Sequence, residues 1–411
     1  MRWRRKAALA GCLSTIRIDR PGIPCARSVH VRCTRSASRF SALTGRAGHK
    51  TRGETMRDDL ITAGQAETLY GLLLARAKRT PHAQAFAEFD RGAQAWAGYS
   101  WAEIRARTDL IADRLAALGL QPGDRVAILM ANGVDWVCFD MAAHKLGLPV
   151  VGLYMNDAAS NGAHVIRDSE PSVILMESAQ RWGEVEALLT DLSFLKEVWV
   201  QPGGPEPDTP PQATLVPLPD VLAREVPTGA PLRAEPDAVA ALIYTSGTTG
   251  TPKGAMLSHR AILSNAEAVH RTFAAYPEDR FLSILPLAHA FERTMGYILP
   301  VMAGASVSYA QSLLRLRQDM ITIRPTVIMG VPRFYESILQ SARHAVSQSP
   351  VRRRLFEMTG QIGWRRFAGR TGQGPGPTVL DHLLWPLLSQ VVSRKIMRAF
   401  GGRLRVACSG G

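Results

Sequence analysis

Cysteine is scarce in this sequence of 411 residues, and long apolar runs are missing from it. Of five cysteines, only Cys138 and Cys408 lie beyond residue 55, and they stand far apart. No CxxC pair and no Cys/His spacing typical of a metal site occurs. The sequence therefore argues against a zinc module or a disulfide framework and fits a reducing compartment. No apolar run reaches the ~18 residues that a membrane-spanning helix needs, so no such helix is expected.

Acidic residues are scarce at the N-terminus, where residues 1–55 hold thirteen Arg and Lys but only Asp19 and Glu54. Eleven of the fourteen net positive charges therefore lie in this leader, and the nearly neutral remainder predicts no nucleic-acid partner. The Arg- and Ser-rich composition is typical of a mitochondrial transit peptide. Alternatively, Met56 is the true start of translation, and residues 1–55 are then not part of the protein. Both alternatives predict a disordered leader outside the fold. They differ in localisation, which is mitochondrial in the first case and cytoplasmic in the second.

Glycine and hydroxyl side chains gather over residues 244–254, which read Tyr-Thr-Ser-Gly-Thr-Thr-Gly-Thr-Pro-Lys-Gly. An apolar run over 239–244 predicts a buried strand before them, and helical spacing of apolar residues over 262–273 predicts a helix after them. Glycine allows close approach of the backbone to a ligand, successive N–H groups bind anions, and the lysine adds a positive charge. The stretch predicts a phosphate-binding loop. It lacks the Gly-Lys-Ser/Thr of the P-loop NTPases.

The body alternates between patterns of helices and strands. Helices are predicted over 66–80, 101–119 and 132–145, and strands over 125–130, 148–154 and 172–175. Strand runs with little alternation suit a sheet that is covered on both faces, and the βαβ order predicts a mainly parallel sheet. A Pro-rich connector, 201–213, is expected to separate a first lobe, 56–200, from a second lobe, 214–411. No internal repeat is present.

Polar residues follow the predicted strand 281–285, where the chain reads Leu-Pro-Leu-Ala-His-Ala-Phe-Glu-Arg over 285–293. His289 and Glu292 thus lie just beyond the carboxyl end of a strand, where open α/β sheets hold ligands. A strand is also expected over 302–309, and a strand, turn and helix start over 325–336.

A helix predicted over 383–400 carries Arg394, Lys395 and Arg398 near its end. Such cations either balance the helix dipole or rest on an anionic membrane surface, and the sequence leaves both readings open.

These motifs resemble the adenylate-forming, AMP-binding superfamily. Residues 244–254 match its signature YTSGTTGxPKG without a departure, and residues 285–293 resemble long-chain acyl-CoA synthetases in particular. Residues 326–336 resemble the family's TVxxGVPRxxE, while Tyr154-Met155-Asn156 departs from the usual Tyr-Pro-Thr. The resemblance implies an α/β fold, the N-terminal domain of an adenylate-forming enzyme, with mainly parallel sheets flanked by helices.

The resemblance also implies a reaction and its residues. A fatty acid would be activated with ATP and Mg²⁺ to acyl-AMP, and coenzyme A would then take the acyl group. Lys253 and His289 are the expected catalytic residues. The expected phosphate ligands are Thr245, Ser246, Gly247, Thr248, Thr249, Gly250 and Lys253, with Thr245 also near Mg²⁺. The expected substrate pocket contains His289, Glu292, Val331, Pro332, Gly410 and Gly411.

Three family features have no counterpart here: the Tyr-Gly-x-Thr-Glu segment, the acidic ribose-binding residue and the lysine of a small C-terminal domain. The sequence is therefore expected to be the N-terminal part of a truncated long-chain fatty acid–CoA ligase that does not sustain turnover by itself. Two alternatives stay open, a non-catalytic nucleotide- or acyl-binding relic and another adenylate-forming ligase, such as an aryl-CoA or fatty acyl-AMP ligase. The sequence predicts neither chain-length preference nor oligomeric state.

Overall fold

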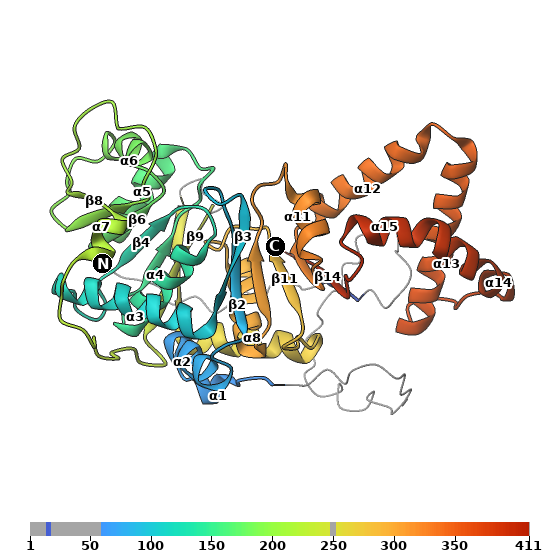
Figure 1. The fold of residues 1–411 in the computed structure, drawn as a ribbon, viewed down its shortest axis with the longest axis horizontal. Coiled ribbons are helices and arrows are strands. Elements are labelled where there is room, and N and C mark those ends of the chain that lie inside the picture. Colours follow the sequence, from blue (N-terminus) through green and yellow to red (C-terminus); the bar gives the residue numbers. More distant parts are fainter. Residues whose placement is uncertain (1–13, 18–58, 247–251, 411) are drawn as a thin grey trace. The chain divides into compact units, whose positions relative to one another are not determined.

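The computed structural model describes residues 14–17, 59–246 and 252–410 (Figure 1). The described residues form two compact units, a larger one of residues 59–316 and a smaller one of residues 317–410 and 14–17. Within the leader, the structure describes one strand, β1 (Ser14–Arg17), which pairs antiparallel with β14 (Val406–Ser409). This strand departs from the expectation of a leader without folded elements. The remainder of residues 1–58 lies outside the described part.

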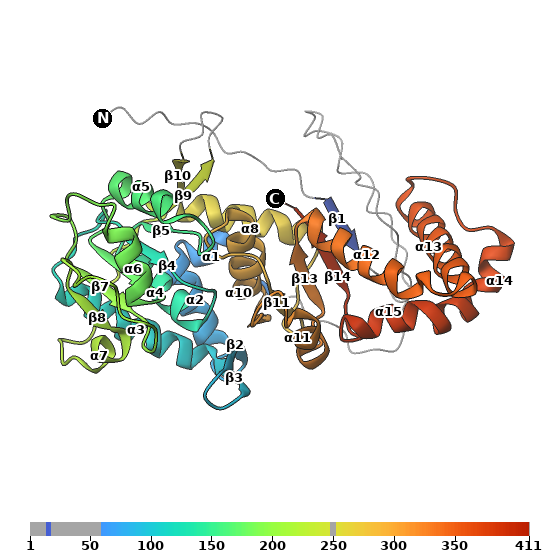
Figure 2. The same ribbon diagram turned by 90° about the horizontal axis from the view of Figure 1, so that it is seen from above.

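The larger unit contains two groups of strands (Figure 2). The first group consists of β4 (Val126–Leu129), β5 (Val150–Gly152), β6 (Val173–Met176), β7 (Glu197–Val200), β8 (Leu215–Pro217), β9 (Val239–Ser246) and β10 (Pro252–Ser258). It forms a seven-stranded sheet in the order β10-β9-β5-β4-β6-β7-β8, in which every pairing except β10 with β9 is parallel. The second group runs in the order β11 (Arg280–Ser283), β12 (Ser306–Tyr309), β2 (Gln84–Asp90) and β3 (Ala95–Ser100). The predicted α/β class with mainly parallel sheets is confirmed.

Helices cover both faces of the seven-stranded sheet. In chain order the helices of this unit are α1 (Ala63–Ala66), α2 (Leu69–Arg79), α3 (Trp101–Ala117), α4 (Val134–Lys145), α5 (Ala159–Ser169), α6 (Ala179–Glu186), α7 (Leu218–Ala223), α8 (His259–Thr272), α9 (Ala290–Glu292), the π-helix η1 (Arg293–Ile298) and α10 (Leu299–Ala303). On one face, Trp182 of α6 packs in a core with Val151 of β5. On the other face, Phe139 of α4 meets Trp199 of β7 edge to face, at 5.6 Å between ring centroids. Because helices bury both faces of the sheet, the side chains on both sides of each strand are apolar, which explains the unbroken apolar runs in the sequence.

Side-chain caps start two of these helices. Helix α2 starts after Thr68, whose side chain accepts a hydrogen bond from the N–H of Gly71, and α3 starts after Ser100 in a capping box with Glu103. The predicted strand 302–309 starts later than expected, at Ser306, because helix α10 continues to Ala303.

The Pro-rich segment 201–213 does not divide the chain into two lobes. Strand β8 follows it and pairs in parallel with β7, which precedes it. The carboxylate of Glu186 accepts hydrogen bonds from the backbone N–H groups of Gln212 and Ala213, which anchors the end of the segment. The division between compact units lies at residue 316 instead. Proline content marks an irregular segment, but pairing across the segment decides whether it separates domains.

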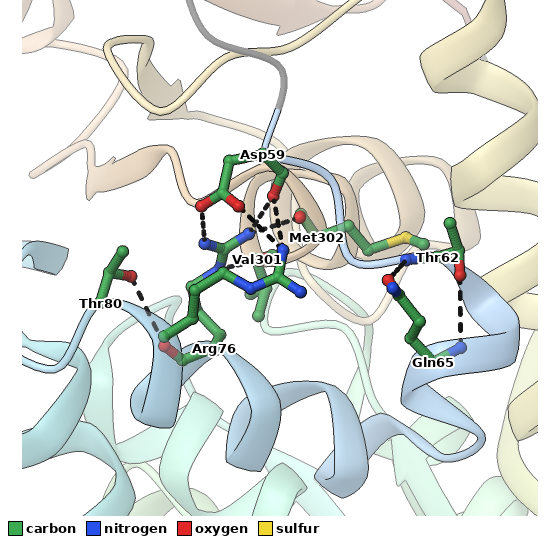
Figure 3. A network of polar contacts seen from close by, with 8 residues as sticks. Asp59, Thr62, Gln65, Arg76, Thr80, Val301 and Met302 are labelled. Atoms are coloured by element: carbon green, nitrogen blue, oxygen red, sulfur yellow. Dashed lines mark hydrogen bonds and ion pairs between the residues drawn. The ribbon is translucent and has the colours of Figure 1, made fainter.

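A buried arginine ties the start of the larger unit to α10 (Figure 3). The guanidinium of Arg76 is fully buried and donates to Asp59 Oδ2 at 2.7 Å. It also donates to the carbonyl oxygens of Val301 and Met302, at 3.0 and 2.7 Å. A buried charge is costly unless its donors are satisfied, and this arrangement satisfies them with the carboxylate of Asp59 and three carbonyl groups, of Asp59, Val301 and Met302.

The smaller unit is mainly helical. Its elements, besides β1 and β14, are α11 (Leu316–Ile323), β13 (Val327–Gly330), α12 (Pro332–Ser347), α13 (Pro350–Thr371), α14 (Val379–Leu388), the π-helix η2 (Ser389–Ser393) and α15 (Arg394–Ala399). Strands β13 and β14 are parallel, with Gly330 opposite Ser409. The predicted strand, turn and helix start over 325–336 are confirmed as β13 and α12. The predicted helix 383–400 is divided into α14, η2 and α15.

Candidate active site

The predicted phosphate loop belongs to a β-hairpin. Strands β9 and β10 are antiparallel, with Thr245 opposite Lys253 and Ser246 opposite Pro252, and helix α8 starts only after β10. The predicted direct passage from the loop into a helix is therefore corrected. Glycine and proline within 250–254 hid the partly exposed edge strand from sequence reasoning. Four predicted phosphate ligands, Gly247, Thr248, Thr249 and Gly250, lie outside the described residues.

Close packing fixes the base of this hairpin. A Cβ atom placed on Gly254 would lie 3.0 Å from Cζ of the Tyr244 ring on the neighbouring strand, so a side chain at this position would require the ring to shift. The hydroxyl of Tyr244 donates to Asp168 Oδ2 of α5 at 2.6 Å. Burial and this hydrogen bond raise the pKa of Tyr244. A further contact of 3.2 Å joins His164 Nε2 of α5 to the carbonyl oxygen of Pro252.

A cavity of 390 Å³ opens beside the base of the hairpin. Its lining includes Tyr244, Thr245 and Pro252 of the hairpin, Gly152 of β5, Tyr154 and Asp157 of the loop between β5 and α5, Asn161 of α5, Arg181 of α6, and His289. Two sequence-predicted site residues, Thr245 and His289, therefore line one cavity. A Cβ atom on Gly152 would lie 2.9 Å from Cα of Ala288, so glycine allows the segment that carries His289 to approach β5.

His289 is held as a neutral imidazole. It is the N-cap residue of α9, and its Nδ1 accepts a hydrogen bond of 3.2 Å from the backbone N–H of Phe291. A ring nitrogen that accepts from an N–H carries no proton, so the proton sits on Nε2 and that atom is the donor. Burial lowers the pKa of His289, which favours the same neutral form. The ring can thus donate one hydrogen bond to a carboxylate or phosphate oxygen.

Glu292 was predicted to line the substrate pocket, but the structure places it in the protein interior. Its side chain is fully buried, and Oε1 accepts a hydrogen bond of 2.7 Å from the hydroxyl of Ser283. Burial, opposed by hydrogen bonds from Ser283 and the backbone of Ile284, raises the pKa of Glu292 to about 8. The carboxyl is therefore protonated at neutral pH, and we assign it to the support of the loop that leads to His289.

Asn132 holds the same loop from the other side. Its Nδ2 donates to the carbonyl oxygen of Leu285 at 2.7 Å and to Ser283 Oγ at 3.1 Å, and its Oδ1 accepts from the N–H of Leu287 at 2.9 Å. Sequence reasoning gave Asn132 no role beyond the start of a predicted helix. It missed Arg181 entirely, because an arginine at a helix start gives no local signal of a cavity.

The remaining predicted pocket residues belong to the smaller unit. Val331 is the N-cap residue of α12, and Pro332 is its first residue. The N–H of Gly410 donates to the carbonyl oxygen of Gly330 at 3.1 Å, which brings Gly410 next to the turn at Val331. Gly411 lies outside the described residues. The structure therefore brings the two predicted sequence motifs of this unit together at the carboxyl ends of β13 and β14.

No group of three or more His, Cys, Asp or Glu that suits a metal ion occurs within the described part of the chain. Thr245, the predicted magnesium neighbour, offers one hydroxyl oxygen on the cavity wall. A single oxygen donor fits a Mg²⁺ ion that reaches its site on substrate phosphates and keeps most of its water.

Comparison with known proteins gives a consistent result. The profile of a family described as AMP-binding enzyme matches residues 73–411. A long-chain-fatty-acid–CoA ligase of Mycobacterium bovis, FadD15, is 30% identical over 321 residues, which cover 77% of this chain and 52% of the relative. Fatty acyl-CoA synthetase A of Dictyostelium discoideum is 30% identical over 338 residues, or 79% of this chain and 47% of the relative. The chain thus spans about half the length of these relatives.

A solved structure shares the fold. The adenylation domain of a carboxylate reductase from Mycobacterium chelonae superposes with a TM-score of 0.63 at 22% identity, covering 83% of this chain and 53% of that one. At this identity the likeness concerns the fold alone. It agrees with the mainly parallel sheets flanked by helices described above.

Proposed function

Because the chain belongs to the AMP-binding enzyme family, we propose that it serves the ATP-dependent activation of a long-chain fatty acid. In the proposed reaction the fatty acid carboxylate attacks the α-phosphorus of ATP, and pyrophosphate leaves. The thiol of coenzyme A then attacks the acyl-adenylate carbonyl and displaces AMP. The 30% identity to long-chain fatty acid–CoA ligases supports this substrate class.

One observation carries the proposal: the hairpin of the phosphate signature and the histidine of the second motif line the same cavity. Thr245 brings a hydroxyl to its wall, and Lys253 sits opposite Thr245 in the hairpin. Departing pyrophosphate gains negative charge as the bond to the α-phosphorus breaks, so donors and a cation held in place lower the barrier.

His289 supplies a donor on the same cavity. Its ring is neutral and carries its proton on Nε2, so it can orient the fatty acid carboxylate by a hydrogen bond. A charged ring would instead form an ion pair, which would make the carboxylate a weaker nucleophile. Mg²⁺ is part of the proposal, with the Thr245 hydroxyl as the protein oxygen nearest to it. The ion would neutralise charge on the phosphates of ATP.

The test is fatty-acid-dependent exchange of labelled pyrophosphate into ATP, measured with the protein expressed from its complete gene. Palmitate should support the exchange, and the Lys253→Ala variant should reduce it by about 10²-fold or more because a charge at the phosphates is lost. Lys78→Ala, a change of an exposed lysine in α2, is the matched control and should leave the exchange intact.

Two outcomes would contradict the proposal. Exchange with benzoate but not with palmitate would identify an aryl acid ligase instead. Binding of ATP without exchange for any carboxylic acid would identify a nucleotide-binding relic.

A further inference from the structure

Helices α13 and α14 of the smaller unit form a hairpin (Figures 1 and 2), and a small apolar core joins them. Trp385 and Leu388 of α14 pack on Ile362 of α13. The guanidinium of Arg365 in α13 makes two hydrogen bonds, of 2.7 and 2.6 Å, to the buried carboxylate of Asp381 in α14. These contacts occupy one face of α14 and leave its opposite face turned outward.

The outward face of α14 is aliphatic. Val379, Leu380, Leu383 and Leu387 recur at the spacing of one helix face and are 78, 62, 72 and 64% exposed. Single exposed apolar side chains are ordinary on a protein surface, but several on one helix face form a continuous apolar strip. Such strips mark surfaces that are covered by a protein or by a membrane.

Exposed basic residues follow α14 and η2 in the next helix, α15. Arg394, Lys395 and Arg398 are exposed, and within the described part of the chain no ion pair or hydrogen bond engages their side chains. Residues 350–400 contain nine Arg and Lys but only two acidic residues, of which Asp381 is buried against Arg365. A helix dipole accounts for cations near a helix end, but it does not account for the aliphatic strip on α14, which precedes them in the chain.

We propose that this face, defined by the exposed residues of 379–398, docks on an anionic phospholipid surface. Leucine and valine are accepted by lipid tails without a matching shape, whereas they are under-represented at the energetic centres of protein interfaces. Arg394, Lys395 and Arg398 are exposed in the helix that follows the strip, and their positive charge complements the phosphates of the headgroups. No helix in the described ranges is both long and apolar enough to cross a bilayer, so the contact is a peripheral one.

This inference is independent of the proposed reaction. The docking face belongs to the smaller unit, whereas the cavity with Thr245 and His289 belongs to the larger one. A failure of pyrophosphate exchange would leave vesicle binding unchanged, and a failure of vesicle binding would leave the exchange assay unchanged.

The test is co-sedimentation of the complete gene product with vesicles of phosphatidylcholine alone and with about 30 mol% phosphatidylglycerol added. The double variant Leu383→Gln/Leu387→Gln should bind the anionic vesicles about tenfold more weakly, because two aliphatic side chains no longer enter the lipid. The matched control is Leu313→Gln/Leu314→Gln, two leucines that are 74 and 97% exposed in the larger unit. It should bind as the unchanged protein does.

A second pair of variants tests the charges. Arg394→Gln/Lys395→Gln/Arg398→Gln should weaken binding to anionic vesicles and leave the weak binding to neutral ones unchanged. Lys78→Gln/Arg91→Gln removes exposed basic residues elsewhere and should have little effect. The thirteen basic residues of the leader are present in every variant, so any vesicle binding by the leader is the same in all of them. Each variant is therefore compared only with its own control. Thermal unfolding followed by circular dichroism should coincide among the variants, since every changed residue is exposed.

Three results would overturn the proposal. Equal vesicle binding of the strip variant and its control would show that the strip does not contact lipid. A change in molar mass by light scattering in the strip variant, without a change in vesicle binding, would show that a second copy covers the strip. Cross-links from Lys395 to another part of the same molecule in lipid-free protein would show that the chain itself covers it.

Discussion

The hydroxyl of Ser283 at the end of β11 donates a hydrogen bond of 2.7 Å to Oε1 of Glu292, which ends α9. This contact closes the loop between the two elements, and His289 lies within that loop. Asn132 holds the same loop through its hydrogen bonds to Leu285 and Leu287. The position of the candidate catalytic histidine therefore depends on a carboxyl group buried in the protein interior.

The titration of Glu292 predicts a pH dependence of stability. Its pKa is about 8 in the folded protein, against an ordinary value near 4.5 in the unfolded chain. Between these values the folded state binds a proton that the unfolded state lacks, so this carboxyl lowers the free energy of unfolding as pH rises from about 4.5 to 8. Glu292→Gln should remove that contribution. Thermal melts at pH 5, 6.5 and 8 would then show a melting temperature that changes less with pH than that of the unchanged protein.

The control for this experiment is Glu206→Gln, which changes an exposed glutamate of the Pro-rich connector. It should keep the slope of the unchanged protein. Parallel slopes for Glu292→Gln and the unchanged protein would contradict a protonated carboxyl at this position.

Two substitutions of His289 separate its capping role from its donor role. Asparagine is a good N-cap residue and can accept from the N–H of Phe291, but it cannot reproduce the Nε2 donor. Both His289→Asn and His289→Ala should lower palmitate-dependent pyrophosphate exchange about 10- to 100-fold. Only the alanine variant should also lose stability, by about 1 kcal/mol, because the cap is lost. Comparable melting temperatures for the two variants would argue against the cap.

The pH profile of exchange gives a second measurement on His289. Because burial lowers the pKa of its ring, the neutral donor should persist below the ordinary histidine value of 6.5, and activity should fall only at more acidic pH. This acid limb should disappear in His289→Asn. An unchanged acid limb in the variant would assign it to another group.

Gly254 offers a test of the hairpin. A methyl group at this position would meet the Tyr244 ring at 3.0 Å and displace it from Asp168. Gly254→Ala should therefore cost about 1–3 kcal/mol of stability and weaken binding of a fluorescent ATP analogue. Gly64→Ala is the control, since a Cβ there meets no atom within 4 Å. Full nucleotide binding by Gly254→Ala would show that the hairpin tolerates the shift.

Arg76 and Arg79 share the carboxylate of Asp59 but differ in burial. The side chain of Arg76 is 0% exposed, and that of Arg79 is 37% exposed. Arg76→Ala should lower the free energy of unfolding by about 3–5 kcal/mol, because Asp59 and two buried carbonyl groups lose their donor. Arg79→Ala should cost at most about 1 kcal/mol, as is usual for exposed ion pairs. Urea denaturation of both variants measures the difference, and equal losses would refute the assigned role of burial.

The sequence predicted much of the framework, because the signals involved are local. The period of apolar residues predicted the existence of α2, α3 and α4. Unbroken apolar runs predicted strands β4 and β6 with both faces covered. The phosphate signature and the second motif named Thr245, Lys253 and His289 as neighbours of one site, and the cavity contains two of them.

Tertiary structure decided what depends on partners far away in the chain. Glu292 is polar and follows a strand, so local pattern placed it in a pocket, yet Ser283 and the surrounding core bury it. The Pro-rich connector looked like a boundary, but strand β8 returns to β7 and keeps one compact unit together. The spacing of apolar side chains indicates which face of a helix or strand is buried. It does not indicate which distant segment covers that face, because this depends on how the segments pack together in the folded chain.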